Sequence, residues 1–157
     1  MILRVMIVED EDMIRNGLVK TLPWADMGCT VIGSAGDGKS GLEQIVERRP
    51  DVVITDIRMP EMDGFEMLER ALAVYRFHII IFTSYAEFDY AQKAISMHAY
   101  DYLLKPLDEK RLAELLARIR ETEEPQEQLE TPGSFSAEEL LKRLAYTDEY
   151  VETALRR

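Results

Sequence analysis

The nine residues Val52-Val53-Ile54-Thr55-Asp56-Ile57-Arg58-Met59-Pro60 predict how the rest of the chain is arranged. Four β-branched residues in a row, between Pro50 and Pro60, are typical of a buried strand and too few for a helix. Asp56 therefore stands at the carboxyl end of a strand. Ligands bind at that end of the strands in parallel α/β folds, because the loops there open a crevice. Asp56 is a candidate site residue, although an aspartate at a strand end also serves as a turn or cap residue.

The length of 157 residues predicts one ordinary domain with some residues left over. The formal net charge of −11 argues against nucleic-acid binding by this polypeptide, since phosphate contacts need clustered Lys and Arg. The single cysteine, Cys29, leaves no internal disulfide and no cysteine-based metal site, which fits a reducing compartment. No apolar run is long enough to cross a membrane, and the N-terminus lacks the pattern of a signal peptide. We expect a cytoplasmic protein that binds neither nucleic acid nor membrane.

Strand and helix signals alternate over the first part of the chain, which is typical of a parallel sheet with helices on both faces. The predicted strands cover residues 3–8, 30–35, 52–55, 77–83 and 100–104. Each strand is followed by apolar residues at helical spacing. Asp63 with Glu66, and Ser84 with Glu87, have the spacing of a capping box and predict the starts of the third and fourth helices. The predicted class is α/β, with five βα units.

The composition changes after Arg120. Residues 121–135 are rich in Glu and Gln and nearly free of apolar side chains, which predicts an acidic linker or an extension of the fifth helix. Residues 136–157 predict a further helical segment, which Ser136 and Glu139 cap. One helix does not make a domain, so this segment is expected to pack on the body, pair with another chain or begin a longer region.

Polar residues fall at the ends of four predicted strands. Glu9 and Asp10 follow the first strand, Asp56 ends the third, Thr83 ends the fourth and Lys105 follows the fifth. Because the carboxyl ends of parallel strands meet at one edge of a sheet, we expect these side chains to lie close together. Three carboxylates repel one another unless a cation neutralises them, and Mg²⁺ prefers oxygen ligands of this kind. With an ammonium and a hydroxyl group beside it, this cluster predicts a phosphoryl-binding site.

Four motifs resemble those of the receiver domain of bacterial two-component response regulators, in the same order along the chain. They are Ile7–Glu11 (IVEDE), Thr55–Gly64 (TDIRMPEMDG), Phe82–Ser84 (FTS) and Asp101–Pro106 (DYLLKP). The resemblance covers roughly the first 120 residues and is specific, because several motifs match together. It implies a flavodoxin-like receiver domain at residues 1–120, with a doubly wound parallel sheet in the strand order 2-1-3-4-5.

The resemblance also implies a role for each matching residue. Asp56 would be the phosphoacceptor for a sensor histidine kinase, and Lys105 would pair with the phosphate. Thr83 would be the switch hydroxyl and Tyr102 the switch aromatic. Such a domain is not a conventional enzyme, because it catalyses only its own phosphorylation and its own dephosphorylation by water.

The metal site implied by the resemblance binds Mg²⁺ through carboxylates and one backbone carbonyl. The carboxylates would be those of Glu9, Asp10 and Asp56, and the carbonyl that of Arg58. Asp10 is favoured over Glu9 as the direct metal ligand. His78 and His98 lie in different elements without metal-ligand spacing and are interpreted as core or surface residues.

Phosphorylation is expected to change a face made of the fourth predicted helix, the fifth strand and the fifth helix. Aromatic and charged side chains on this face suit a partner, and a homodimer could form through it. The side chains are those of Tyr90, Tyr100, Lys93, Lys110 and Arg111. Tyr102 could alternatively be a static core aromatic.

The dipeptide Pro23-Trp24 and the run Tyr85–Ala91 (YAEFDYA) resemble receivers that are fused to helix-turn-helix activators of the arabinose-regulator type. This resemblance implies control of transcription through an output domain that is not among the 157 residues. A stand-alone receiver that acts by protein contacts is the alternative, and the sequence leaves both open.

Residues 33–40 (GSAGDGKS) satisfy the Walker A pattern between a strand and a helix, and residues 52–56 could pass for a Walker B strand. On pattern alone, these two stretches indicate nucleotide hydrolysis. Asp37, however, would put a negative charge inside an anion-binding loop, and this hypothesis leaves the polar residues at the other strand ends unexplained. The competing interpretation is a turn that caps the second helix.

Overall fold

The computed structural model describes residues 1–123, in which strands and helices alternate. The strands are β1 (Leu3–Val8), β2 (Cys29–Ala35), β3 (Val52–Thr55), β4 (His78–Thr83) and β5 (Asp101–Leu104). The helices are α1 (Asp12–Thr21), α2 (Gly38–Arg48), α3 (Gly64–Leu72), α4 (Phe88–Ser96) and α5 (Glu109–Glu123). None of these helices is long and apolar enough to span a membrane. The predicted helical segment at 136–157 and the predicted linker after residue 123 lie outside the described residues.

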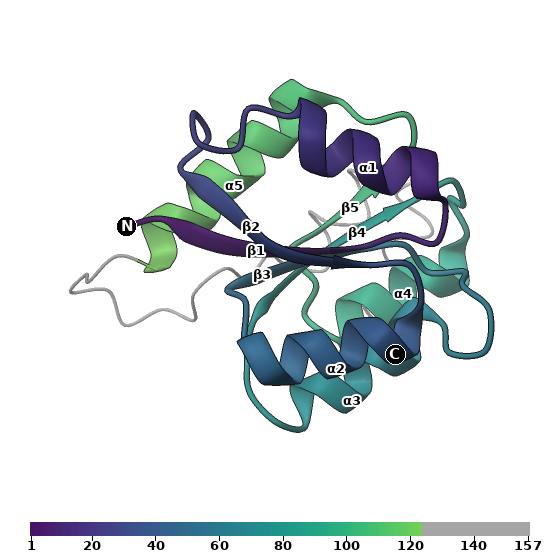
Figure 1. Ribbon diagram of the computed structural model, residues 1–157. Coiled ribbons are helices and arrows are strands. Elements are labelled where there is room, and N and C mark those ends of the chain that lie inside the picture. The colour runs from purple at the N-terminus through teal and green to yellow at the C-terminus, as the bar shows by residue number, and fades with distance from the viewer. Residues whose placement is uncertain (124–157) are drawn as a thin grey trace.

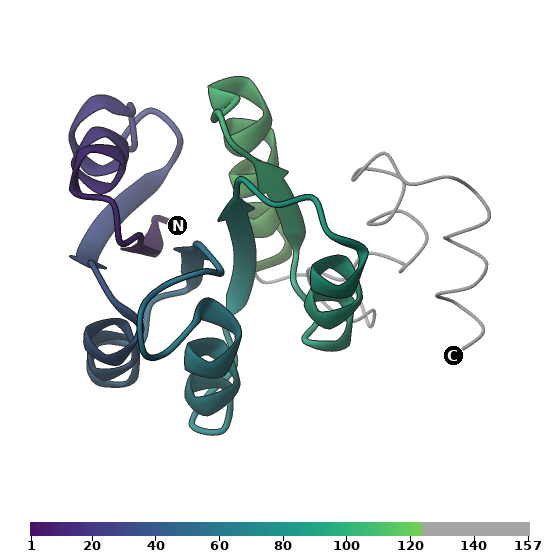
Figure 2. The ribbon, with the colours of Figure 1, turned by 90° about the vertical axis from the view of Figure 1, so that its right-hand side faces the viewer.

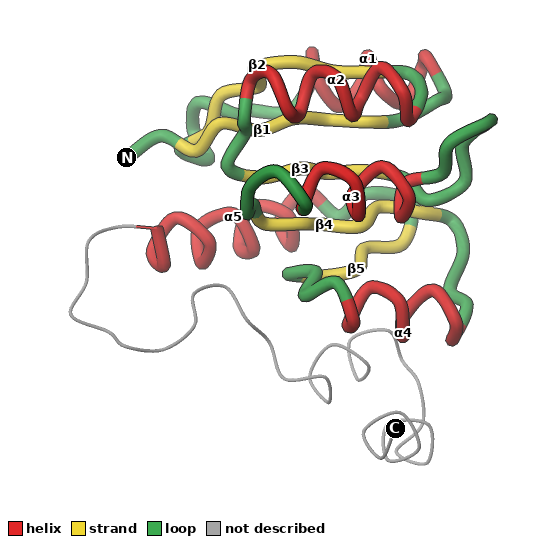
Figure 3. Tube along the Cα trace, turned by 90° about the horizontal axis from the view of Figure 1, so that it is seen from below, coloured by secondary structure: helices red, strands yellow, loops and turns green. Residues whose placement is uncertain are grey.

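The strands form one parallel sheet in the order β2-β1-β3-β4-β5, which confirms the flavodoxin-like class (Figure 3). Helices α1 and α5 cover one face, and α2, α3 and α4 cover the other (Figure 1). The central strand β3 pairs with β1 and β4, and all four of its residues are buried. A strand covered on both faces needs no polar alternation, which explains the continuous β-branched run.

The side chains of β1 show how the two helical layers share the sheet. Leu3, Val5 and Ile7 point into the core beneath α1 and α5, and Met6 and Val8 into the core beneath α2, α3 and α4. This alternation follows from the two-residue repeat of a strand. The carboxyl edge of the sheet faces the viewer in Figure 2, and the loops that carry the polar residues follow the strands there.

Helix starts decide how the loops at this edge are shaped. The predicted start of α3 is confirmed, because the Asp63 carboxylate accepts a hydrogen bond from the Glu66 backbone N–H at 2.8 Å. The predicted cap of α4 is wrong: the helix begins at Phe88, and its N-cap residue Glu87 makes no side-chain cap hydrogen bond. The Glu87 carboxylate pairs instead with Arg58 at 2.9 Å. Residues 84–87 therefore form a loop, the β4–α4 loop.

Candidate functional site

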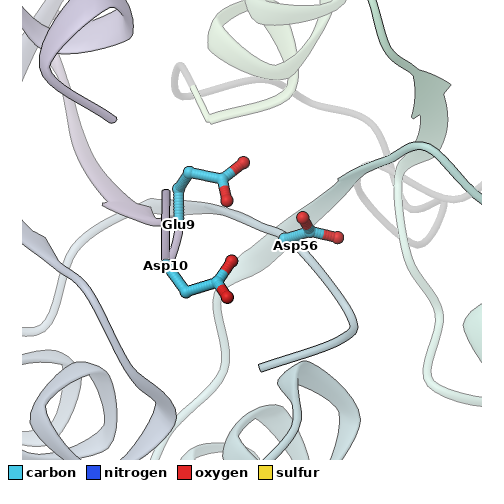
Figure 4. Close-up of side chains that lie close together, drawn as sticks. All are labelled: Glu9, Asp10 and Asp56. Carbon is cyan, nitrogen blue, oxygen red and sulfur yellow. The ribbon is translucent and has the colours of Figure 1, made fainter. Parts of the chain in front are cut away.

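Three carboxylates gather at the carboxyl edge of the sheet. Val8 of β1 and Thr55 of β3 are register partners, so Glu9 and Asp56 follow them side by side, with Asp10 next in the chain. Carboxylate oxygens of the three acids all lie within 4.8 Å of one another (Figure 4). The structure thus brings together the three carboxylates predicted from the strand ends.

Lys105 supplies the positive charge of this cluster. Its Nζ lies 2.5 Å from Glu9 Oε1 and 2.8 Å from Asp56 Oδ2. Burial opposes the charge on this lysine, but its hydrogen bonds to Asp56 and Glu9 outweigh burial and raise its pKa. The lysine therefore stays charged and ties the end of β5 to the ends of β1 and β3.

Glu9 is the most deeply buried of the acids, with 1% of its surface exposed. Burial raises its pKa, and the hydrogen bonds from Lys105 and from the Glu11 backbone N–H oppose that rise. The two oxygens of the Glu9 carboxylate have different neighbours: Oε1 faces the Lys105 ammonium, and Oε2 accepts a hydrogen bond from the Glu11 backbone N–H at 3.2 Å. Three carboxylates so close together suit a cation that neutralises them, and a donor set made only of oxygen atoms suits Mg²⁺. The residues present therefore fit the predicted ion.

Backbone contacts on both sides place Asp56. Its N–H donates to the Val8 carbonyl at 3.0 Å, and its Oδ1 accepts from the Ile57 N–H at 2.7 Å. Gly64 crosses so close that a Cβ on it would lie 2.1 Å from the Asp56 carbonyl oxygen. Sequence reasoning missed this glycine, although it stands in the matched motif at 55–64, because the close approach is visible only in the fold.

Thr83 and Tyr102, the two predicted switch residues, both contact Tyr85 in the β4–α4 loop. The buried Thr83 hydroxyl accepts a hydrogen bond from the Tyr85 N–H at 3.4 Å. The Tyr102 ring is buried, and its hydroxyl donates to the Tyr85 carbonyl. One peptide segment of the loop is thus held by both residues, and sequence reasoning had given Tyr85 no role in the site.

The Arg58 side chain reaches from the loop after Asp56 to the β4–α4 loop. Its guanidinium lies 3.7 Å over the Tyr85 ring, and it donates at 2.9 Å to both Tyr90 Oη and Glu87 Oε1. The role expected of its backbone carbonyl as a metal ligand stays a prediction. The side chain connects the loop after Asp56 with the start of α4.

The predicted interaction face on α4, β5 and α5 needs one correction. Tyr100 is only 5% exposed, because it enters β5 pointing into the core beneath α1 and α5. Lys93 and Lys110 are exposed, and Tyr90 and Arg111 are half-buried. The face is therefore more charged and less aromatic than predicted.

The Walker-like stretch has the structure of a helix-capping turn. The Asp37 carboxylate accepts a hydrogen bond from the Ser40 N–H at 2.7 Å, so the chain's own carboxylate occupies the start of α2. A Cβ on Gly38 would lie 2.3 Å from the Met62 carbonyl oxygen, so close packing against a neighbouring loop accounts for this glycine. These contacts favour the capping interpretation over a phosphate-binding loop.

The fold and the site together define a doubly wound α/β domain with an oxygen-lined acidic site and a buried lysine at its carboxyl edge. The chain belongs to the response regulator receiver domain family, whose model matches residues 5–117. This match confirms the resemblance inferred from the motifs.

Relatives of known name are response regulators. The chain is 36% identical over 151 residues to the transcriptional regulatory protein HptR of Staphylococcus aureus (strain N315). The aligned residues cover 94% of this chain and 60% of HptR. The chain therefore spans about 60% of the length of the curated relatives that it matches. Its fold is similar to that of the REC domain of AraT, a response regulator from Geobacillus stearothermophilus, with a TM-score of 0.70 and 39% identity over 77% of this chain and 95% of that one. A LuxR-family DNA-binding response regulator from Staphylococcus aureus gives a TM-score of 0.65 at 30% identity, over 72% and 94% of the two chains.

Proposed function

We propose that this receiver domain accepts a phosphoryl group on Asp56 from the phosphohistidine of a sensor histidine kinase and acts as the switch of a two-component system. The observation that carries the proposal is the Lys105 bridge, in which a buried lysine holds Asp56 Oδ2 at 2.8 Å beside two further carboxylates. A carboxylate in this setting is fixed in place and lies next to a cation that can stabilise an incoming phosphate.

The transfer makes one bond and breaks one. A carboxylate oxygen of Asp56 attacks the phosphorus and forms an O–P bond, while the N–P bond of the phosphohistidine breaks and the imidazole nitrogen keeps the electron pair. Lys105 donates to an oxygen of the transferred group. Glu9, Asp10 and Asp56 would hold Mg²⁺, which would neutralise part of the charge on the transferred group. Water later attacks the phosphorus of the acyl phosphate, which breaks the O–P bond to Asp56, releases inorganic phosphate and restores the carboxylate.

The change of state begins at Thr83. Phosphate on Asp56 offers acceptor oxygens to the Thr83 hydroxyl, whose contact with the Tyr85 N–H is long at 3.4 Å. Movement of the hydroxyl toward the phosphate draws the β4–α4 loop inward, and the Tyr102 ring, bonded to the Tyr85 carbonyl, follows it. The face on α4, β5 and α5 changes as a result and forms a homodimer.

The output of the switch is control of transcription, through a DNA-binding domain that belongs to a longer protein. Two observations support this part of the proposal: the curated relatives are longer than the chain, and HptR is named a transcriptional regulatory protein. A stand-alone receiver that acts on another protein is the second candidate.

Labelling of the acceptor tests the phosphotransfer. The parent should acquire an acid-labile, hydroxylamine-sensitive phosphate from acetyl phosphate with Mg²⁺, and Asp56→Asn should acquire none. Asp26→Asn, which changes an exposed aspartate in the turn before β2, should label like the parent. Persistent labelling of Asp56→Asn would move the acceptor to another residue. With ATP alone, hydrolysis that is lost in Lys39→Ala and kept in Asp56→Asn would make the chain a nucleotide hydrolase instead.

Light scattering tests the proposed dimer. Beryllofluoride with Mg²⁺, as a phosphate mimic, should shift the parent from monomer toward dimer and leave Thr83→Ala monomeric. An unchanged mass in the parent would contradict the dimer and leave a different protein as the partner. An equal shift in both proteins would remove the hydroxyl from the mechanism.

A further inference from the structure

Arg15, in the first turn of α1, is directed back toward the loop that carries the acidic pair. Its Nη1 donates to the Glu9 carbonyl at 2.8 Å, and its Nη2 pairs with Asp12 at 2.6 Å. Only 18% of the Arg15 side chain is exposed. A half-buried arginine that binds a backbone carbonyl shapes the backbone there.

The glycine at position 36 makes room for this arginine. A Cβ on Gly36 would lie 2.7 Å from Arg15 Nη1, and the three nearest atoms to it all belong to the Arg15 guanidinium. Gly36 is one of the glycines of the Walker-like stretch at 33–40, which the proposed function leaves without a role. The position of the Arg15 guanidinium therefore depends on two segments: the Glu9 carbonyl binds it, and Gly36 leaves space for it.

We infer that Arg15 is a positioning residue for the divalent cation: it holds the peptide unit between Glu9 and Asp10 in the orientation that aims both carboxylates at the ion. The Glu9 carbonyl belongs to that peptide unit, and on its other side the Glu9 N–H donates to the Ala35 carbonyl at 3.0 Å. With Arg15 in place, the backbone of Glu9 is fixed from both sides. This inference rests on the proposed metal-dependent function.

Charge and positioning predict opposite effects of removing the guanidinium. A positive side chain near a cation site repels the ion, so charge alone predicts that Arg15→Ala binds a divalent cation more tightly. Loss of positioning predicts weaker binding, by about tenfold, which is typical when a group that orients a metal ligand is removed. The direction of the change in affinity therefore distinguishes the two mechanisms.

The probe is Mn²⁺, which takes the same oxygen ligands as Mg²⁺ and whose free form is measured by electron paramagnetic resonance. Arg15→Ala should bind Mn²⁺ about tenfold more weakly than the parent, and Arg15→Lys should recover part of the loss. Gly36→Ala keeps the arginine but displaces it, so it should show a similar loss of affinity. Its new Cβ meets only the end of a flexible side chain, so urea unfolding without divalent ions should show nearly parental stability. Lys20→Ala, which removes an exposed charge from the last turn of α1, is the matched control and should bind like the parent.

The double variant Arg15→Ala/Gly36→Ala completes a double-mutant cycle with the two single variants. If both substitutions act through the guanidinium, the double variant should bind Mn²⁺ no more weakly than Arg15→Ala alone. Parental or tighter binding by Arg15→Ala would overturn the inference while leaving the metal site intact, and so would parental binding by Gly36→Ala. A parent that binds no Mn²⁺ would overturn the metal part of the proposed function and this inference with it.

Discussion

Replacing Gly64 with alanine tests whether the start of α3 holds Asp56 and the loop after it in place. The new Cβ would lie 2.1 Å from the Asp56 carbonyl oxygen and 3.1 Å from its carbonyl carbon. Carbon and oxygen atoms that are not bonded approach to about 3.3 Å, so the two backbones must separate by roughly 1 Å. Both are backbone atoms, which cannot rotate away as the end of a side chain can.

The size of the effect follows from two contributions. Overpacking of this kind costs about 1–3 kcal/mol. Separation also stretches the hydrogen bond from the Gly64 N–H to the Ile57 carbonyl, which is 2.7 Å long, and its loss costs about 1 kcal/mol. We expect Gly64→Ala to lower the free energy of unfolding by about 2–4 kcal/mol. For a domain of this size, that lowers the melting temperature by roughly 10 °C.

Gly17→Ala is the matched control. A Cβ at this position in α1 meets nothing within 4 Å, so the helix gains about 1 kcal/mol from the better propensity of alanine. Urea unfolding, followed by the fluorescence of the buried Trp24, measures both variants. At a temperature where both are folded, acetyl phosphate should label Gly64→Ala more slowly than Gly17→Ala. Equal stability and equal labelling of the two variants would refute the argument.

Three further predictions concern ionisable groups. Mg²⁺ at ten times its dissociation constant should raise the free energy of unfolding by about 1.4 kcal/mol, and Asp10→Asn should lose most of this gain. Melting temperatures that do not change with Mg²⁺ in either protein would count against the site. Lys105, whose pKa is raised by Asp56 and Glu9 against the effect of burial, stabilises the fold below the pKa of an unfolded lysine, about 10.4, and ceases to do so as the pH rises through its raised pKa. Lys105→Gln should therefore be less stable than the parent near neutral pH in urea unfolding, with a gap that narrows at alkaline pH; a constant gap would contradict this. Burial raises the pKa of Cys29 to about 11, so an aromatic disulfide reagent should react with the native thiol far more slowly than with the unfolded one, and equal rates would show an accessible thiol.

The residues that could be predicted from the sequence are those placed by the chain direction alone. Glu9, Asp56 and Lys105 follow strands, and parallel strands end at one edge, so their proximity needs no knowledge of side-chain packing. The start of α3 was predictable for a similar reason, since Asp63 caps a backbone N–H three residues away.

Contacts between distant segments account for what could not be predicted. Ser84 and Glu87 have the spacing of a capping box, but the Glu87 carboxylate accepts a hydrogen bond from Arg58, 29 residues away. Helix α4 therefore begins without a side-chain cap. Gly64 and Gly36 look like ordinary turn glycines, and only the folded chain shows which atoms occupy the space of their missing Cβ. Tyr100 was predicted to lie on an exposed face but is buried. The face to which a side chain at the start of a strand points depends on the register of the sheet, which the sequence does not show.

The three contacts at Tyr85 have a consequence for genetics. Its N–H meets the Thr83 hydroxyl, its carbonyl meets the Tyr102 hydroxyl, and its ring carries the Arg58 guanidinium. Mutations at the three partner positions therefore alter one shared peptide segment, and their effects should be epistatic. A selection for second-site suppressors of Thr83→Ala should return changes at Arg58 and Tyr102 more often than at positions of matching exposure elsewhere in the domain.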